Sequence, residues 1–527
     1  MKLEHAHESV PLAMTIGIGL GLALGCGYML GNGDEKTAGL ILAGICVVGF
    51  LLVARERIWM IIPAFWMLNG KMAVLPLPFT VAQLAIFLAF GMFLLLKALK
   101  VVRMKPKNGI VEIWMLIMLG YLVTVYMRNP VGVEALGFDL VGGKPYVDIC
   151  VAYAAYWVLA RVVVPVRQAL WVPLLGLFGT SVHSFLNFLA FRYSGLVGPL
   201  ANLYSGIAAA ESNADPLAAL PEEGGGGRLA YLQGLGTALA STATCFWRPF
   251  TLINPVHFRR FMMFMSGVAF ILLSGFRSNI IGIFEIFMLS SYFRRGWGEL
   301  LRAGALGVVA IAFMVLLQGN VIDLPLSAQR ALSFLPGKWE EAAKSEAESS
   351  TQWRIEMWKA MMTGDKYIKN KWLGDGFGFT HYQLETMAAN SFGGTHSNAQ
   401  ENLMISGGVH SGPISTIRYV GYVGLAIFLV LLVLLSVRAA RLIRRAQGTP
   451  FFPLALSFGM GTVLMPFSFI FIFGAFESDL PAVILTVGFQ RLLENSLEAY
   501  EGKEKESRPE VIQPPKFQPG RQFAPVG

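Results

Sequence analysis

Residues 410–437 read HSGPISTIRYVGYVGLAIFLVLLVLLSV and join a long polar segment to an apolar run. The run from Leu425 to Val437 has the composition of a membrane-spanning helix, which needs about 20 mostly apolar residues. The segment before it, residues 319–411, is rich in Lys, Asp, Glu, Asn, Gly and Trp. It cannot lie in hydrocarbon, because each unpaired polar group there costs several kcal/mol. We therefore expect a folded cap on one membrane face, with His410 at the mouth of the next helix.

The composition of the whole chain predicts an all-α polytopic membrane protein. Of 527 residues, 55% are hydrophobic and only 14% are charged, whereas about a quarter of residues are charged in soluble domains. A net charge of +9 is compatible with nucleic-acid binding, but the basic residues cluster in short loops between apolar runs, as cytoplasmic loops do. We expect no nucleic-acid partner. The four cysteines lack metal-site spacing, so neither disulfides nor zinc are expected.

Apolar runs of about 17 to 25 residues predict about fourteen spans, with twelve or thirteen as alternatives. The first run is too long for a signal-peptide core and is interpreted as a retained span. The predicted spans are residues 11–31, 38–54, 57–76, 79–98, 110–127, 149–165, 168–188, 229–246, 259–275, 279–293, 301–318, 413–437, 451–475 and 479–495. The segments 57–76, 229–246 and 479–495 are the weakest of these.

Two basic clusters predict the orientation of the chain. Residues 97–107 and 438–445 contain several Lys and Arg and no acidic side chain. The positive-inside rule puts both clusters in the cytoplasm. Alternation of the spans then sends four connections to the outer face: residues 128–148, 189–228, 275–278 and 319–411. We therefore expect the functional residues to lie on the outer side of the membrane.

This pattern divides the chain into four parts. Residues 211–228 are Gly- and Pro-rich and are expected to be a flexible insertion. The last residues have too little apolar surface to offset the entropy of ordering. The predicted parts are N-terminal membrane helices at 1–258, a core at 259–440 that contains the loop 319–411, C-terminal membrane helices at 441–497 and a disordered cytoplasmic tail at 498–527.

Two arginines are candidates for binding a phosphate. Arg277 stands between two apolar runs, where a permanent charge is costly, so it is either a snorkelling residue of a tight helical hairpin or an outward-facing bidentate phosphate ligand. Arg354 belongs to residues 351–361, whose apolar and aromatic residues recur at helical spacing. That spacing predicts a helix lying on the membrane.

Glycines and histidines of the polar segment supply the other candidates. Gly376 and Gly378 alternate with aromatic residues in a predicted tight turn, and turn formation is favoured over ligand contact because no phosphate-loop Lys-Ser/Thr follows. The histidines His396 and His410 do not have metal-ligand spacing, so no metal is expected. A lone histidine at a helix mouth suits proton transfer, although a position beside a helix without any chemistry remains open.

Three segments, in this order, resemble the O-antigen ligase and O-antigen polymerase superfamily. They cover mainly residues 260–440. The first segment, Leu272–Asn279, resembles a Leu-Ser-x-Ser-Arg-Gly span junction. The second runs from Arg354 to Trp358 and on to the Leu373–Gly378 turn, and it resembles Arg-x-x-x-Trp followed by Leu-Gly-x-Gly-x-Gly. The third, His410-Ser411 with Gly421 and Gly424, resembles a His-Asn/Ser motif with its glycines.

The resemblance implies a glycosyltransferase of the GT-C type in a bacterial inner membrane. It would transfer a glycan from an undecaprenyl-diphosphate-linked donor to lipid A core or to a glycan acceptor, with inversion, without a metal and without a cofactor. Arg277 and Arg354 would stabilise the diphosphate as charge develops on it, and His410 would orient or deprotonate the acceptor hydroxyl. Gly376, Gly378, Arg418 and His396 are the further candidates for substrate binding.

Ligase and polymerase differ only in the acceptor, and the sequence leaves both open. An exporter or flippase for the same lipid-linked sugars is a rival of another class, since it too would need basic residues and many spans. It would not need an outer cap that ends in a histidine. A non-catalytic assembly subunit, whose cap binds a partner, is the third alternative.

Overall fold

The computed structural model describes residues 25, 28, 37, 41, 42, 44, 54–72, 79–100, 108–132, 138–207, 229–393 and 396–507. Among these residues the regular elements are all helical, with only isolated β-bridges beside them. The chain forms two compact units, one of residues 1–59 with 91–102 and one of residues 60–90 with 103–527. The first predicted span, the insertion at 211–228 and the end of the tail lie largely or wholly outside the described residues.

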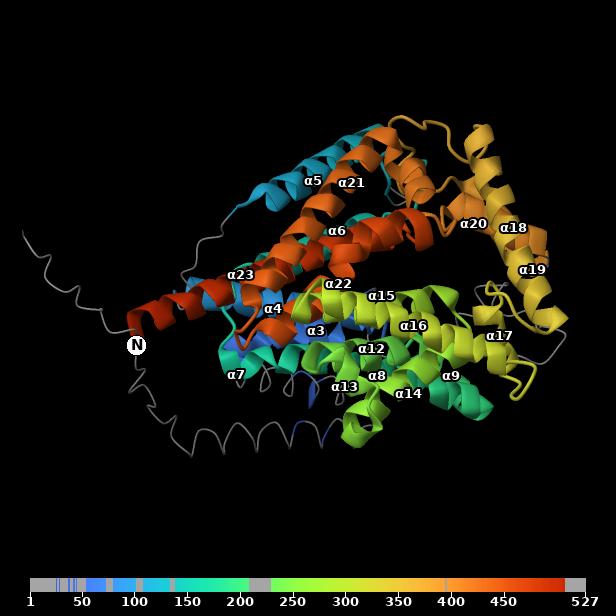
Figure 1. Ribbon diagram of the computed structural model, residues 1–527. Coiled ribbons are helices and arrows are strands. Elements are labelled where there is room, and N and C mark those ends of the chain that lie inside the picture. The colour runs from blue at the N-terminus through green and yellow to red at the C-terminus, as the bar shows by residue number, and fades with distance from the viewer. Residues whose placement is uncertain are drawn as a thin grey trace, which may run out of the picture. The chain divides into compact units, whose positions relative to one another are not determined.

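The second unit contains almost all of the described helices (Figure 1). Its long helices are α4 (Val81–Ala98, which continues into the first unit), α5 (Ile110–Arg128), α6 (Lys144–Leu159), α8 (Trp171–Arg192), α12 (Tyr231–Phe246), α14 (Phe258–Ser274), α15 (Arg277–Arg295), α16 (Trp297–Leu317), α21 (Gly412–Ala446), α22 (Phe452–Phe467) and α23 (Phe476–Ser507). The polar segment forms α17 (Leu326–Leu332), α18 (Glu341–Thr363), α19 (His381–Gly393) and α20 (His396–Ser406). The shorter elements are η1 (Arg55–Met60), α3 (Ile61–Phe65), α7 (Val166–Ala169), η3 (Ser194–Leu196), α9 (Val197–Leu203), α13 (Pro249–Leu252), η4 (Pro255–His257) and η5 (Ser468–Ile472).

Seven described helical segments are long and apolar enough to cross a membrane, and this agrees with a multi-pass membrane protein. They are Val81–Ala98, Ile110–Arg128, Val166–Arg192, Pro255–Ser274, Trp297–Leu317, Gly412–Ala446 and Phe452–Ile472. The predicted span 57–76 is wrong as a single helix, because the helical part ends at Phe65. The predicted tail is also too long: α23 continues to Ser507, so residues 498–507 are helical.

The polar segment folds as a cap at one end of the second unit. Figure 1 shows α18, α19 and α20 together at the right, whereas α23 ends at the left. The cap reaches the connection after α5 through paired hydrogen bonds, Val141 N to Phe379 O at 3.0 Å and Phe379 N to Val141 O at 2.9 Å. Two connections that were predicted to share the outer face are therefore in contact.

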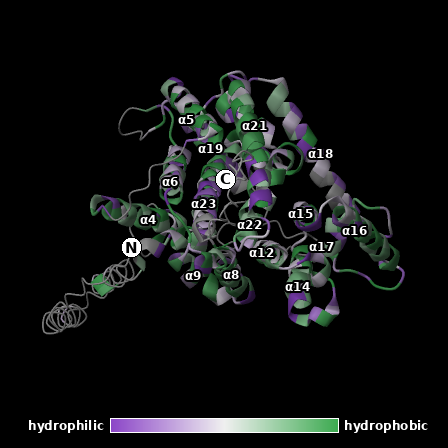
Figure 2. Cartoon of the chain, turned by 60° about the vertical axis from the view of Figure 1, so that its left-hand side comes forward, coloured by the Kyte–Doolittle hydropathy of each residue, from purple (hydrophilic) through white to green (hydrophobic). Residues whose placement is uncertain are grey.

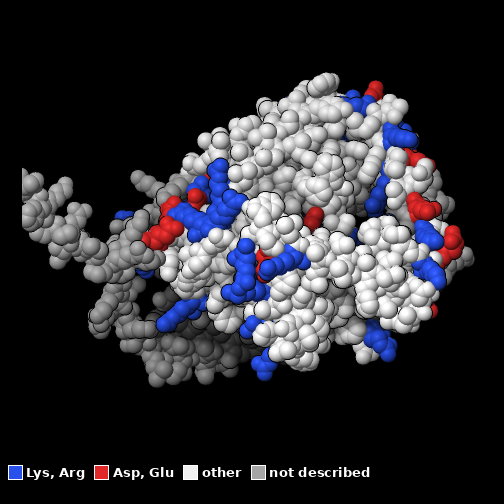
Figure 3. All heavy atoms as spheres, in the orientation of Figure 1, with Lys and Arg blue, Asp and Glu red and all other residues white. Residues whose placement is uncertain are grey.

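Polarity changes sharply between the cap and the long helices. In Figure 2, α5 and α21 are coloured mostly hydrophobic, while α18 carries neutral and hydrophilic residues. Figure 3 shows charged side chains of both signs over the cap at the right and a second, mainly basic group toward the left, with the upper part of this face largely uncharged. This distribution is typical of helices in hydrocarbon with polar groups at both ends.

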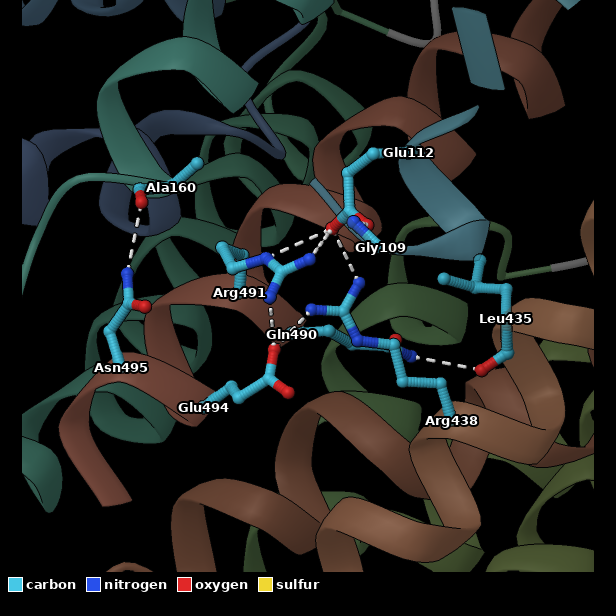
Figure 4. Close-up of polar contacts among 9 residues, drawn as sticks. All are labelled: Gly109, Glu112, Ala160, Leu435, Arg438, Gln490, Arg491, Glu494 and Asn495. Atoms are coloured by element: carbon cyan, nitrogen blue, oxygen red, sulfur yellow. Dashed lines mark hydrogen bonds and ion pairs between the residues drawn. The ribbon is translucent and has the colours of Figure 1, made fainter. Parts of the chain in front are cut away.

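An ionic network joins the start of α5 and the last third of α21 to the middle of α23 (Figure 4). The carboxylate of Glu112, which is 1% exposed, is 2.7 Å from Arg438 Nη1 and 2.6 Å from Arg491 Nη2. Glu494 accepts from the same two guanidinium groups, at 2.7 and 2.6 Å. Two acids therefore offset two bases in a buried place, where an unpaired charge would be costly. Arg438, the first residue of the basic cluster 438–445, is therefore part of the helix α21.

Candidate functional site

The helix that follows His410 is interrupted by a sharp kink. α21 begins at Gly412 with Pro413 in its first turn, as Pro413 predicts, but Gly421 has φ 69° and ψ −177°. This region of backbone space is essentially restricted to glycine. A Cβ at Gly421 would also overlap the carbonyl oxygen of Trp372. The kink therefore requires glycine for two reasons, backbone conformation and close approach.

The turn at residues 371–376 supplies the hydrogen bonds that the kink removes. In a regular helix the amides of Tyr422 and Val423 would donate four residues back. Here they donate to the carbonyls of the turn, Tyr422 N to Lys371 O at 2.9 Å and Val423 N to Trp372 O at 3.2 Å.

The two carbonyls that the kink leaves are also satisfied. They accept from the turn, Arg418 O from Asp375 N at 3.1 Å and Tyr419 O from Gly376 N at 2.9 Å. These four polar backbone groups are thus paired across the kink, as a site near hydrocarbon requires. We call residues 371–376 with 418–423 the α21 joint.

The α21 joint explains the predicted glycine turn. Gly374 has φ 79°, and a Cβ there would overlap the backbone of Tyr419. Gly376 and Gly378 are buried, the first against Asn129 and the second against Leu140. Since the amide of Gly376 donates within the protein, the geometry favours turn formation over ligand contact for this segment.

Arg418 lies inside the protein at the same joint. Its side chain is 4% exposed, and Nη1 is 3.5 Å from a carboxylate oxygen of Asp375. Asp375 also accepts from the amides of Lys369 and Asn370, at 2.8 and 2.9 Å. These contacts place Arg418 between α21 and the turn, away from solvent.

His410 is held in a strained conformation between two aromatic rings. Its φ is 54°, and among the described non-glycine residues only Lys100 also has a positive φ. The centre of its ring is 6.3 Å from that of Trp353 in α18 and 5.2 Å from that of Phe473, which follows η5. Trp358 Nε1 donates to the carbonyl of the preceding residue, Val409, at 2.9 Å. Strain of this kind costs about 1 to 3 kcal/mol and is common at functional sites.

The cap helix α18 packs on the protein through its apolar residues. Met357 and Met361 are buried with Val409 and Ile417 in one hydrophobic cluster. The predicted helix over residues 351–361 is therefore confirmed, but its apolar face covers the start of α21 and does not lie on lipid. The reason is that the chain after α20 returns beneath α18 and offers it an apolar partner.

Arg277 is the first residue of α15 and faces the cap. Its Nε donates to the carbonyl of Arg330, near the end of α17, at 3.2 Å. A helix begins with unpaired N–H groups and a partial positive charge, which repels a guanidinium and attracts an anion. The carbonyl of Arg330 satisfies part of the guanidinium, and the start of α15 remains an electropositive place.

An open pocket of about 730 Å³ lies beside Arg277. Its walls are the α17–α18 connection, the first half of α18 and Arg277 itself. The lining residues are Arg277, Ser333, Phe334, Leu335, Pro336, Gly337, Trp339, Lys344, Glu348, Thr351 and Gln352. We call it the Arg277 pocket. Its volume is in the range of small-molecule sites, which is about 300 to 1,000 Å³.

Residues 351–354 of α18 connect this pocket to His410. Thr351 and Gln352 line the Arg277 pocket, and Trp353 contacts the ring of His410. The guanidinium carbon of Arg354 is 5.7 Å from the centre of the Trp353 ring. One stretch of helix therefore brings Arg277, Arg354 and His410 into a single region. His396 begins α20 in the cap, and its side chain lies outside the described residues.

The cap is cross-linked by an exposed ion pair between Lys366 and Glu401, with Nζ 2.8 Å from Oε1. The hydrogen bond from Lys366 lowers the pKa of the Glu401 carboxyl, and the same bond raises the pKa of Lys366. The pair's contribution to the free energy of unfolding is therefore lost only as the pH falls below the usual carboxyl pKa of about 4.3 or rises above the usual lysine pKa of about 10.4. Between these limits its charge state is constant.

Sequence reasoning missed three residues of this region. Lys344 lines the Arg277 pocket, and Trp353 and Phe473 flank His410. Trp353 had a signal, since it lies in the amphipathic segment beside Arg354. Lys344 and Phe473 had none, because only the folded chain brings them to the site. Within the described part of the chain, no three His, Cys, Asp or Glu side chains are grouped as metal ligands.

Comparisons with known proteins add no relative. No protein-family model matches the chain, and no curated protein matches it. The interpretation of the site therefore rests on its own geometry and on the resemblance of the three segments.

Proposed function

We propose that the protein transfers a glycan from a polyprenyl-diphosphate donor to an acceptor hydroxyl on the outer face of the membrane, as an O-antigen ligase-like enzyme of the GT-C type. The undecaprenyl form of a bacterial inner membrane is the proposed donor. Lipid A core is the proposed acceptor, and a growing glycan is the alternative that would make the enzyme a polymerase.

One observation carries this proposal. Residues 351–354 join a pocket that contains Arg277 to the ring of His410, with Arg354 on the same stretch. A leaving diphosphate needs cations where its charge develops, and an attacking hydroxyl needs a proton acceptor close by. Both kinds of group occur in one region at the mouth of a membrane helix.

The proposed reaction is a single displacement. The oxygen of the acceptor hydroxyl forms a bond to the anomeric carbon as the bond from that carbon to the diphosphate oxygen breaks. The proton of the hydroxyl moves to the imidazole of His410, and the electron pair leaves with the polyprenyl diphosphate, beside Arg277 and Arg354. Attack opposite the leaving group inverts the anomeric carbon.

Replacing His410 with Ala tests the proposal. We expect transfer to fall by about 10²- to 10⁴-fold, the usual contribution of a general base, with donor binding little changed. Membranes of a deletion strain that expresses each variant are assayed between pH 5.5 and 8.5. With wild-type protein, transfer should decrease toward low pH, because a protonated imidazole cannot accept the proton of the hydroxyl. The Lys366–Glu401 pair keeps its charge across this range, so it does not produce that decrease.

His396→Ala is the matched control and should lose much less activity. Near-normal transfer by His410→Ala, or equal losses for both variants at equal protein level, would contradict the assignment of the base. The glycan ladder of the deletion strain separates the alternatives: lost transfer to the lipid core indicates a ligase, shortened chains indicate a polymerase, and precursor accumulated inside the cell indicates an exporter.

A further inference from the structure

We propose that the Arg277 pocket binds a diphosphate and the sugar attached to it, with Lys344 as the second phosphate-binding cation. This inference rests on the proposed function for the identity of the ligand, but its evidence is separate. It concerns the pocket formed by the α17–α18 connection and the start of α15, and it assigns a role to a residue that no sequence motif includes.

The first argument is the environment of Lys344. It lies in the first turn of α18, is half-buried and lines the pocket together with Arg277. Three other lysines of the cap have polar partners: Lys338 donates to Asn320 Oδ1 at 2.7 Å, Lys366 pairs with Glu401 and Lys371 pairs with Asp365 at 2.8 Å. Lys344 has no hydrogen bond or ion pair from its side chain within the described part of the chain.

An anion in the pocket would give this ammonium the polar partner that the described side chains do not supply. The nearest acid in sequence that also lines the pocket, Glu348, is one helical turn away, and no ion pair joins it to Lys344. The lysine is therefore available to a ligand. Lys359 and Lys369 also lack an ion pair in the described structure, but both are exposed to water and neither lines the Arg277 pocket.

The second argument is the match between the cations and a diphosphate. A diphosphate that links a lipid to a sugar carries one negative charge on each phosphate. Arg277 offers a planar fork to one phosphate and Lys344 a point charge to the other. Two cations on the wall of one pocket suit a ligand with two adjacent phosphates.

The third argument is the remainder of the lining. Glu348, Thr351 and Gln352 provide side-chain oxygens and an amide, which suit sugar hydroxyls, and the exposed ring of Phe334 offers an apolar surface. A volume of about 730 Å³ accommodates a diphosphate with its first sugar ring but not a long glycan. The rest of the glycan would extend out of the open side of the pocket.

The test measures binding without transfer. Full-length protein in detergent micelles is titrated with undecaprenyl diphosphate, undecaprenyl monophosphate and inorganic pyrophosphate, and the Kd of each is obtained from the shift in Tm. Lys344→Gln should weaken binding of undecaprenyl diphosphate by about three- to tenfold, the effect expected for one partly screened charge pair. It should change binding of the monophosphate much less.

Two variants serve as matched controls. Lys344→Arg keeps the charge and should restore most of the affinity, whereas Lys359→Gln makes the same charge change on the exposed part of α18 and should bind as the wild type does. Tighter binding of undecaprenyl diphosphate than of inorganic pyrophosphate would identify the lipid-linked form as the ligand. Equal binding of the two would overturn the lipid-linked assignment.

The two proposals fail in different ways. If Lys344→Gln and Lys359→Gln bind undecaprenyl diphosphate equally, or if all three probes fail to bind the wild-type protein, the inference about the pocket is wrong even where transfer by the wild-type protein is observed. If Lys344→Gln loses affinity as expected but the wild type transfers no glycan, the pocket stands and the proposed function is wrong.

Discussion

His410 shows how a single residue can be placed against its own conformational preference. Its positive φ costs free energy that glycine would not cost. The neighbouring chain fixes it there, since Trp358 holds the carbonyl of Val409 and the rings of Trp353 and Phe473 flank the imidazole. Backbone strain of this kind is common at functional sites and is a reason to test this position.

Comparing His410→Ala with His410→Gly tests this explanation. Both variants lose the imidazole and its ring contacts, so both should lose transfer. Glycine adopts a positive φ without strain, and the glycine variant should be more stable than the alanine variant by about 1 kcal/mol, after part of the gain is offset by its larger unfolded-state entropy. The measurement is the Tm of both proteins in the same detergent, and an alanine variant that is the more stable of the two would refute a strained backbone at this position.

Arg418, a candidate for substrate binding, lies inside the folded protein. It is 3% exposed and lies beside Asp375 in the α21 joint. A buried ion pair contributes little net stability, but removing one partner leaves an uncompensated charge. The charge of Arg418 therefore matters for the position of the turn, and through the turn for α21.

At the scale of elements, the α21 joint combines two segments that are about fifty residues apart in the chain. The Gly-rich turn and the kinked helix exchange four backbone hydrogen bonds. Tyr121 of α5 adds a hydroxyl that donates to Val420 O at 3.0 Å. The joint sets the direction of the first two turns of α21, and these turns carry His410 at their start.

Replacing Gly421 with Ala should break this joint. Alanine does not adopt the backbone conformation of Gly421, and its Cβ would overlap Trp372. We expect a loss on the order of 3 kcal/mol or more in the free energy of unfolding, together with loss of transfer. Thermal unfolding in detergent and the glycan ladder measure the two effects.

Gly461→Ala is the control for that substitution. Gly461 lies within the helix α22, and a Cβ there would meet no atom within 4 Å. Alanine favours a helix by about 1 kcal/mol over glycine, so this variant should be as stable as the wild type or slightly more stable. Equal destabilisation by the two substitutions would mean that the kink has no special requirement for glycine.

At the scale of the second unit, the cap and the ionic network hold the same helices at two separate places. The Glu112, Arg438, Arg491 and Glu494 network joins the start of α5 and the last third of α21 to the middle of α23, and the α21 joint ties α21 to α5 and the cap. Two separate attachments restrict sliding of α21 along α5. The cap side chains around His410 are thus placed on a rigid support.

The side of the membrane that each end of α21 faces is open to a direct test. The arginines of residues 438–445 predict that this part of α21 faces the cytoplasm and that the cap faces outward. A phosphatase fused after Ser350 should be active, and one fused after Gln447 should be inactive. The reverse pattern would put Arg277 and His410 in the cytoplasm and remove the basis of the proposed function.

The sequence by itself determined the multi-pass, all-α character of the chain, the polar cap and the start of α21 near Pro413. These features follow from local properties of the chain, namely the length of apolar runs, the cost of polar groups in hydrocarbon and the fixed φ of proline. Arg277 and His410 became candidates in the same way, since a charge between two spans and a histidine beside a helix start are visible in the order of residues.

Only the tertiary structure decided which side chains and backbone groups the candidate residues contact. In the folded chain Arg418 is buried beside Asp375, and the glycines of the turn are part of the α21 joint. The apolar face of α18 packs on the protein, and Lys344 lines the Arg277 pocket. Each of these outcomes depends on contacts between segments far apart in the chain. Local composition sets where the chain is helical and where it is polar, but the pairing of distant side chains is set by the packing of the helices that carry them.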